Sequence, residues 1–227
     1  LTEPRDAAAL SLAIQRILED SALRERLARS SEARARREFD QRAIARYSME
    51  AYDEVARGKR LDHLRMTSRQ LVLHVLPDDR RRGAQAYAGR LRDAFARSPR
   101  QQHLAVTLFG GPEGALRPDV TLRVKPGLWR RAIDPRAAWR LRRLVKRTQP
   151  DVVVAHGGEP LKYVVPASSG VAKTAYYKVG LSSTELARPS RLRLFRALGR
   201  QVDLAVAVSN DIAVQLNAVL RVPLGRI

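Results

Sequence analysis

The spacing of apolar residues along this chain changes once, close to residue 71. Before it, residues 1 to 58 place apolar side chains at helical spacing, such as Leu23 and Leu27, and show no strand pattern. Apolar residues three and four apart lie on one face of a helix. The spacing therefore predicts an all-helical segment over residues 1 to 58, followed by a junction over residues 59 to 70.

From Leu71 onward, short apolar runs alternate with longer segments of helical spacing. Short runs rich in β-branched residues are typical of strands buried on both faces. Strands that alternate with helices favour a parallel sheet covered on both faces and joined by right-handed crossovers. The predicted strands are 71–76, 104–109, 120–124, 152–155, 174–178 and 203–208, and the predicted helices are 84–96, 135–148, 159–168, 191–198 and one that begins after Ser209.

One stretch places polar groups directly after a buried strand. The run from Val152 to Ala155 is too short for a helix, and His156, Gly157, Gly158 and Glu159 follow it. Open α/β sheets bind ligands outside the carboxyl ends of their strands. We therefore expect the His156 imidazole to open onto a cavity there, where it can donate to a hydroxyl or an anionic oxygen, or accept when neutral. The alternative is a surface loop with a satisfied histidine, and Glu159 is interpreted as a helix-start residue.

Three other loops offer polar groups at the same predicted edge. Gly83, Ala84 and Gln85 open a helix, where backbone amides and the helix dipole favour an anion. Lys178 ends a strand, and Ser209 and Asn210 follow the last strand, with Ser209 interpreted first as a helix cap. The glycine spacing is neither a dinucleotide fingerprint nor a P-loop, and the sequence shows no metal-ligand spacing and no nucleophile elbow. No cofactor and no metal are predicted.

Charge and composition restrict the possible classes of binding partner but do not select one of them. The net charge of +20 favours an anionic partner, which could be nucleic acid, anionic lipid or a phosphorylated substrate. The absence of cysteine excludes disulfides and fits a reducing compartment. The basic segments 136–147 and 191–200 carry Trp139 and Phe195, so their faces are either solvated or rest on an anionic membrane. A non-catalytic basic module that binds nucleic acid or membrane is thus the alternative to an enzyme.

Three pieces of sequence suggest a family when they are taken together. They are the Gly83-Ala84-Gln85 loop, the run from Gln149 to Gly157, and the run from Val202 to Ser209 with residues 221–227 after it. With these pieces, residues 71 to 227 resemble the N-terminal, acceptor-side domain of family-4 retaining glycosyltransferases, which have the GT-B architecture of two Rossmann-like domains. Arg82 stands where the family usually has the first of two glycines. The resemblance implies an α/β fold with a Rossmann-like, doubly wound parallel sheet, preceded here by the helical segment.

The resemblance also implies an activity and roles for the candidate residues. The intact enzyme would transfer a sugar from a nucleotide-sugar donor to a sugar or lipid-linked acceptor with retention, in the cytoplasm or at the inner face of the membrane. His156 would be the catalytic residue that orients the reacting sugar. The substrate-binding residues would be Gly83, Ala84, Gln85, Gly157, Lys178, Ser209 and Asn210. Nucleic acid is not an expected partner on this interpretation.

Residues 1 to 58 resemble the opposite end of the same family, its C-terminal tail. The order of the two parts is therefore inverted, which we interpret either as two joined reading frames with Met66 at the seam or as a window on a tandem enzyme. Because the chain begins at Leu1 and the donor-binding domain would follow Ile227, we expect a fragment that is inactive by itself.

Overall fold

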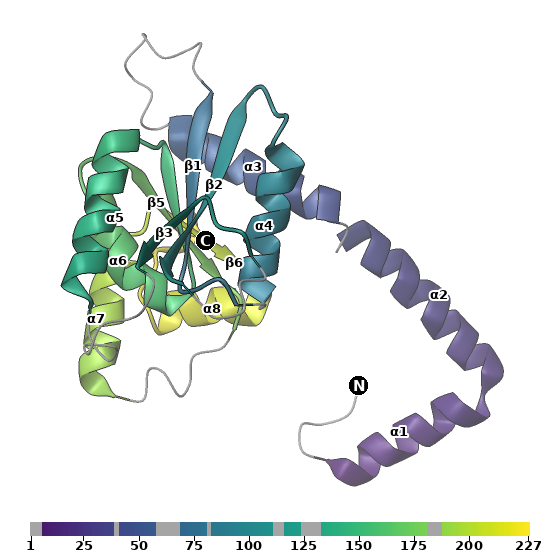
Figure 1. The fold of residues 1–227 in the computed structure, drawn as a ribbon. Helices are drawn as coiled ribbons and strands as arrows, with labels where there is room; N and C mark the ends of the chain where they lie inside the picture. The colour runs from purple at the N-terminus through teal and green to yellow at the C-terminus, as the bar shows by residue number, and fades with distance from the viewer. Residues whose placement is uncertain are drawn as a thin grey trace. The chain divides into compact units, whose positions relative to one another are not determined.

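The computed structural model describes residues 6–38, 41–57, 69–80, 83–110, 116–123, 133–180 and 188–227. The chain divides into two compact units, Leu1–Met49 and Glu50–Ile227 (Figure 1). Most of the predicted junction, with Met66, lies outside the described residues.

The first unit is helical, as predicted. Its elements are α1 (Ala7–Glu19), α2 (Ser21–Glu38) and the beginning of α3 (Gln41–Arg57), which ends in the second unit. Asp20 separates the first two helices because its carboxylate accepts a hydrogen bond from the Leu23 amide at 2.8 Å and so caps α2. No residue of α1 is buried.

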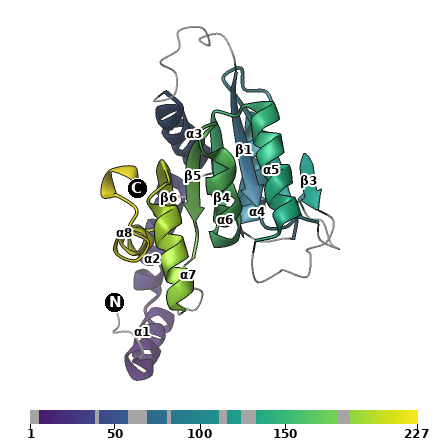
Figure 2. The same ribbon diagram turned by 90° about the vertical axis from the view of Figure 1, so that its left-hand side faces the viewer.

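The second unit is built on a six-stranded sheet with the order β3-β2-β1-β4-β5-β6. All neighbouring strands are parallel, which confirms the predicted α/β fold class. Figure 2 shows β3 and β6 at opposite edges of this sheet. The strands are β1 (Gln70–Leu76), β2 (Gln101–Phe109), β3 (Val120–Arg123), β4 (Val152–His156), β5 (Lys173–Lys178) and β6 (Leu204–Ala207).

Helices cover both faces of the sheet. They are α4 (Gly83–Phe95), α5 (Pro135–Thr148), α6 (Gly158–Ser168), α7 (Pro189–Gly199) and α8 (Asn210–Ala218), and a short 3-10 turn, η1 (Leu224–Arg226), closes the chain. In Figure 1, α5 and α6 lie on one side of the sheet and α4 on the other. The beginning of α5 follows directly from its sequence: Asp134 accepts hydrogen bonds from the amides of Arg136 and Ala137, and Pro135 occupies the first turn.

Alternate residues of the strands build two separate apolar layers. Leu73 and Val153 point to the layer that α5 and α6 cover, whereas Val72 and Val152 point to the opposite layer. In that opposite layer, Tyr52 and Ala56 from the end of α3 are fully buried. The part of α3 that belongs to the second unit, with Tyr52 and Ala56, therefore packs on the sheet.

β2 differs most from the sequence prediction, β6 differs at both ends, and β1, β3, β4 and β5 each differ by one residue at one end. β2 begins at Gln101, three residues before the predicted start at Leu104, and β6 is shorter than predicted at both ends. The start of β2 was missed because its residues are polar and apolar spacing was the only signal used. Gln101 and His103 are nevertheless buried, because they hydrogen-bond within the sheet.

Candidate active site

The strand order reverses between β1 and β4, which are neighbours in the sheet although β2 and β3 separate them in sequence. The chain leaves β1 towards one edge of the sheet and leaves β4 towards the other. Such a point is where open α/β sheets form a ligand crevice, outside the carboxyl ends of the strands. His156 and Lys178 are the last residues of β4 and β5, and the other predicted site residues come after β1, β4 and β6, so all of them lie towards the carboxyl ends of the strands.

Gly157 has a backbone conformation that explains why a glycine stands there. Its φ is 90° and its ψ is 177°, a region that residues with a side chain rarely adopt. The Gly157 amide donates to the Tyr177 carbonyl of β5 at 3.0 Å, which extends the pairing of β4 and β5 by one residue. The turn then starts α6, where Glu159 in the first turn pairs with Lys162 at 2.7 Å.

The loop after β1 is held from inside by Gln85. This residue is buried, and its Nε2 donates to the Asp78 carboxylate at 3.0 Å and to the Asp78 carbonyl at 3.3 Å. Asp78 also accepts from Arg80 Nε at 2.9 Å. The side chain of Gln85 thus fixes the loop, while Gly83 is exposed and Ala84 half-buried at the beginning of α4.

The remaining predicted residues lie at the ends of β5 and β6. Lys178 is buried at the end of β5. Ser209 accepts a hydrogen bond from the Ile212 amide at 3.4 Å, which confirms it as the cap of α8. Asn210 is exposed in the first turn of the same helix.

The expectation that the His156 imidazole opens onto a cavity is wrong for this structure, because the residue is buried and only 2% exposed. Two aromatic rings pack beside it: the Tyr177 ring of the neighbouring strand and the Tyr87 ring of α4 have centroids 5.3 Å and 6.1 Å away. These two tyrosines stack on each other with centroids 4.5 Å apart. The imidazole therefore lies in a packed aromatic layer under α4.

Three histidines on adjacent strands form a buried hydrogen-bonded chain. His74 Nδ1 lies 2.9 Å from His156 Nε2, and His74 Nε2 lies 2.8 Å from His103 Nδ1. His103 Nε2 in turn lies 2.9 Å from Gln101 Oε1. The chain runs obliquely across β2, β1 and β4 and ends at His156, whose Nδ1 is buried and has no hydrogen-bond partner among the described residues.

Burial keeps all three imidazoles neutral. It lowers the pKa of His103 to about 4 and that of His156 to about 3, and it lowers the pKa of His74 well below its usual value. At neutral pH, each ring therefore offers one N–H donor and one acceptor nitrogen. The three rings therefore form a neutral hydrogen-bonded chain inside the protein, and this chain contains no positively charged imidazole.

Sequence reasoning missed His74 and His103 because neither belongs to a motif. The signal that could have pointed to them is that three of the predicted strands or their flanks each carry one histidine. That signal is weak without the register, because only strand pairing shows that the three side chains share one face of the sheet.

The basic helices differ from each other in what they expose. On α5, Trp139 is 59% exposed and the Arg143 guanidinium lies 5.3 Å from the centre of its ring. On α7, by contrast, Phe195 is 7% exposed and belongs to the apolar core. The expectation that Phe195 lies on an outward basic face is therefore wrong, because the ring points to the sheet and only its neighbours face solvent.

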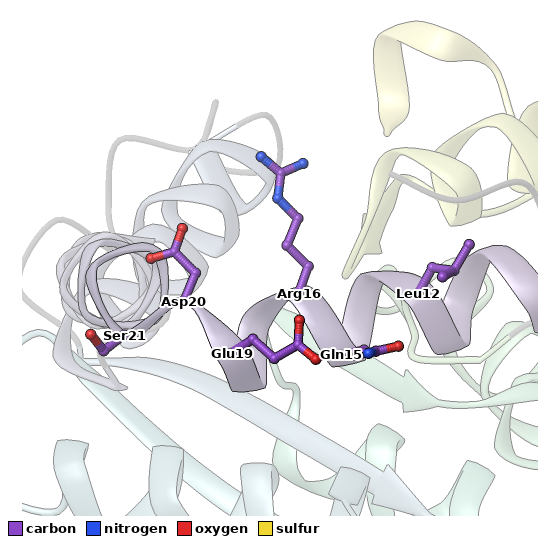
Figure 3. A pocket seen from close by; sticks show the side chains of 6 residues that line it. All are labelled: Leu12, Gln15, Arg16, Glu19, Asp20 and Ser21. Atoms are coloured by element: carbon purple, nitrogen blue, oxygen red, sulfur yellow. Dashed lines mark hydrogen bonds between the residues drawn. The ribbon is translucent and has the colours of Figure 1, made fainter.

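Other parts of the described chain offer little chemistry. A hollow at the junction of α1 and α2 is lined only by exposed side chains, namely Leu12, Gln15, Arg16, Glu19, Asp20 and Ser21 (Figure 3). Within the described ranges, no group of three or more His, Cys, Asp or Glu side chains could hold a metal ion. No helix of the described residues is long and apolar enough to cross a membrane.

Comparison with solved structures gives remote similarities. One is a candidate UDP-N-acetylglucosamine 2-epimerase from Listeria monocytogenes, with a TM-score of 0.47 and 13% identity, over 66% of this chain and 42% of that one. Another is the UDP-GlcNAc 2-epimerase from Methanocaldococcus jannaschii, with a TM-score of 0.45 and 13% identity, over 65% and 41%. This chain thus spans less than half the length of either protein.

Comparison of sequences is more informative. No curated protein matches this chain. A family model, however, matches residues 81–227, which is more than half of the chain and includes every predicted site residue. That family is Glycosyltransferase Family 4, and the chain belongs to it.

Proposed function

We propose that this chain supplies the acceptor-side half of an enzyme that transfers a sugar from a nucleotide-sugar donor to a sugar or lipid-linked acceptor. The reaction proceeds with retention of anomeric configuration, and the donor site lies on a second Rossmann-like domain outside these 227 residues. The observation that carries the proposal is the family match over residues 81–227, together with the placement of the candidate residues at one carboxyl edge of the sheet.

The geometry of that edge suits a sugar acceptor bearing phosphate or hydroxyl groups. The exposed Gly83 begins α4, and a Cβ at this position would meet no atom within 4 Å, so the approach to the first amides of the helix is open. Backbone amides at a helix N-terminus bind anionic oxygen well. Ser209 and Asn210 follow β6 at the same carboxyl edge and are exposed, whereas His156 and Lys178 end β4 and β5 as buried residues beneath it.

In this proposal the chain positions the acceptor and contributes little to leaving-group departure. Stabilisation of the charge that develops on a departing group is usually the largest catalytic effect. The groups that stabilise the nucleotide diphosphate belong to the donor domain. We therefore expect the 227-residue chain to bind ligand without turning over any nucleotide-sugar.

Ligand-observed NMR with glucose 6-phosphate, mannose 6-phosphate and methyl α-D-mannopyranoside, which represent phosphate-bearing and neutral acceptors, tests the proposal. We expect saturation transfer from the wild-type chain to at least one of these probes. Gly83→Val, which fills the open approach to α4, should weaken the binding of a phosphate-bearing probe at least tenfold. Gly225→Val is the matched control, because Gly225 is also exposed with no atom within 4 Å of its Cβ position but lies in η1.

Three results would contradict the proposal. If no probe receives saturation transfer, the chain does not carry the proposed acceptor site. If both glycine variants weaken probe binding equally, the N-terminus of α4 is not part of that site. Turnover of a nucleotide-sugar by the 227-residue chain would show that the donor site is not on another domain. Retention is tested on the intact enzyme, by anomeric proton couplings of the product.

The exposed face of α5 adds a partner to this proposal. Trp139 and Arg143 lie on a helix that carries no acidic residue, a composition that favours contact with anionic lipid headgroups. We propose that the enzyme works in the cytoplasm and touches the inner face of the membrane there. Sedimentation with phosphatidylglycerol vesicles tests it: Arg143→Glu should reduce binding, and equal binding by the wild type and this variant would exclude the contact.

A further inference from the structure

The hydrogen-bond chain that ends at His156 has a direction, which is set at its other end by Asp53 of α3. The carboxylate of Asp53 can only accept hydrogen bonds. Gln101 Nε2 lies 2.9 Å from Asp53 Oδ1 and 3.0 Å from Gln70 Oε1, so the amide nitrogen uses both of its hydrogens on these two acceptors. The Gln101 oxygen is thereby turned to His103.

This orientation fixes the proton of each histidine in turn. The Gln101 oxygen accepts, so the nitrogen that faces it, His103 Nε2, must carry the hydrogen. A neutral imidazole has one N–H, and His103 Nδ1 is therefore an acceptor for His74 Nε2–H. By the same step, His74 Nδ1 accepts from His156 Nε2–H.

At the other end of the hydrogen-bond chain, His156 is left with one nitrogen that can only accept a hydrogen bond. His156 Nε2–H is used by His74, so its Nδ1 holds a lone pair. That nitrogen is buried and has no hydrogen-bond partner among the described residues. A buried acceptor without a donor costs free energy, so this nitrogen is the end of the chain at which a further hydrogen bond would be stabilising.

We infer that Asp53 is a positioning residue which, through Gln101, His103 and His74, fixes His156 as its Nε2–H tautomer and presents Nδ1 as a hydrogen-bond acceptor. Nδ1 is buried in this structure, so a ligand group that reaches it must displace part of the packing around it and must be a donor, such as a sugar hydroxyl, and not an anionic phosphate oxygen. This last clause rests on the proposed function, whereas the tautomer rests on the geometry alone. The inference gives the end of α3 a role in the site, although it lies outside the segment that matches the family.

The path of the hydrogen-bond chain connects a residue near the amino ends of the strands to a residue at their carboxyl ends. Gln101 begins β2, His74 lies in the middle of β1, and His156 ends β4. In register, Val72 pairs with His103 and His74 pairs with Val154, so each step moves one strand across and two residues along. Side chains two residues apart lie on the same face of a sheet, which is why the steps are continuous.

NMR of the chain labelled with 15N in its imidazole rings tests the inference without any ligand. Two-bond proton–nitrogen correlations distinguish the Nε2–H tautomer, the Nδ1–H tautomer and the imidazolium. The chain has four histidines, so single substitutions suffice for assignment. We expect His74, His103 and His156 to be Nε2–H tautomers at pH 7. An Nδ1–H tautomer, a mixture or an imidazolium at His156 would overturn the inference.

The role of Asp53 is tested by Asp53→Asn. An asparagine can present either its oxygen or its NH2 to Gln101, so the direction of the chain is no longer compulsory. We expect His156 to lose Nε2–H intensity to a new Nδ1–H population. The control is Glu54→Gln, which makes the same charge change at an exposed neighbour on the same helix and should leave the spectrum unchanged.

An unchanged spectrum in folded Asp53→Asn would overturn the assignment of Asp53. If that variant does not fold, Gln101→Met takes its place, since it removes the acceptor that fixes His103 while keeping the length of the side chain. A mixed tautomer population is again expected, and the wild-type pattern would be the contrary result.

A bound probe separates this inference from the proposed function. Whichever of glucose 6-phosphate, mannose 6-phosphate or the methyl mannoside binds should shift the His156 Nδ1 resonance while that nitrogen stays unprotonated. Proton transfer to Nδ1 on binding would overturn the donor-group clause. Failure of all probes to bind would count against the proposed function. The histidine tautomers of the free protein would still test whether Asp53 fixes His156 as its Nε2–H form.

Discussion

The histidine chain predicts that its middle and its end respond differently to the same substitution. His74→Leu removes two hydrogen bonds and leaves two buried groups without partners, His103 Nδ1 and the His156 N–H. Each buried group of this kind costs about 1–3 kcal/mol, for a sum of about 2–6 kcal/mol. Leucine is more easily buried than histidine and offsets part of this, so we expect a destabilisation of about 2–4 kcal/mol.

His156→Leu should cost much less. It also leaves one acceptor, His74 Nδ1, without a donor, but it removes an acceptor that already has no partner among the described residues, His156 Nδ1. The two effects are of similar size and opposite sign, so the expected change in the free energy of unfolding is within about 1 kcal/mol of zero.

Urea unfolding followed by tryptophan fluorescence measures both variants. Both tryptophans lie after residue 128, so the signal comes from outside the first helical unit, and Trp139 lies on α5, which packs on the sheet. An unchanged m-value shows that the midpoint shift reports stability. Equal destabilisation by the two substitutions, or a larger cost at position 156, would refute the hydrogen-bonded chain in which His74 has two buried partners and His156 is the end with an unpaired nitrogen.

Three further predictions concern stability. Each of the three buried histidines has a pKa below the value of about 6.5 in an unfolded chain, so the stability that depends on its being neutral is present above pH 6.5 and is lost as the pH falls below it. Between pH 7 and pH 5 the free energy of unfolding should therefore fall by roughly 5 kcal/mol for the three together. Urea unfolding measures this loss, which should be smaller in His74→Leu. Gly199→Ala should destabilise the protein by about 1–3 kcal/mol, because its Cβ would meet the Leu220 carbonyl oxygen at 2.5 Å. Gly225→Ala is the control, because its Cβ would meet no atom within 4 Å. Equal shifts of the unfolding temperature in the two variants would contradict this prediction. Asp134→Ala should cost about 1 kcal/mol through loss of the α5 cap, and an unchanged midpoint of unfolding would show that the cap contributes nothing.

Much of the candidate site could be predicted from the sequence because it depends on local order along the chain. A strand followed by a glycine turn and a helix places His156 and Gly157 at a carboxyl edge whatever the rest of the sheet does. Ser209 was recognised as a cap from its position before an apolar-periodic segment, and the structure confirms it. The role of Gln85 in holding Asp78 was not predicted, since that contact depends on how the loop folds back on α4.

The sequence by itself determined the elements, their alternation and hence the fold class, because apolar period and capping residues act over a few neighbouring positions. Only the tertiary structure decided which side chains meet. His74 bonds to partners 29 and 82 residues away, and Asp53 bonds to a residue 48 positions later. Strand order and register are set by packing of the whole sheet, so the buried line from Asp53 to His156 has no counterpart in any local pattern.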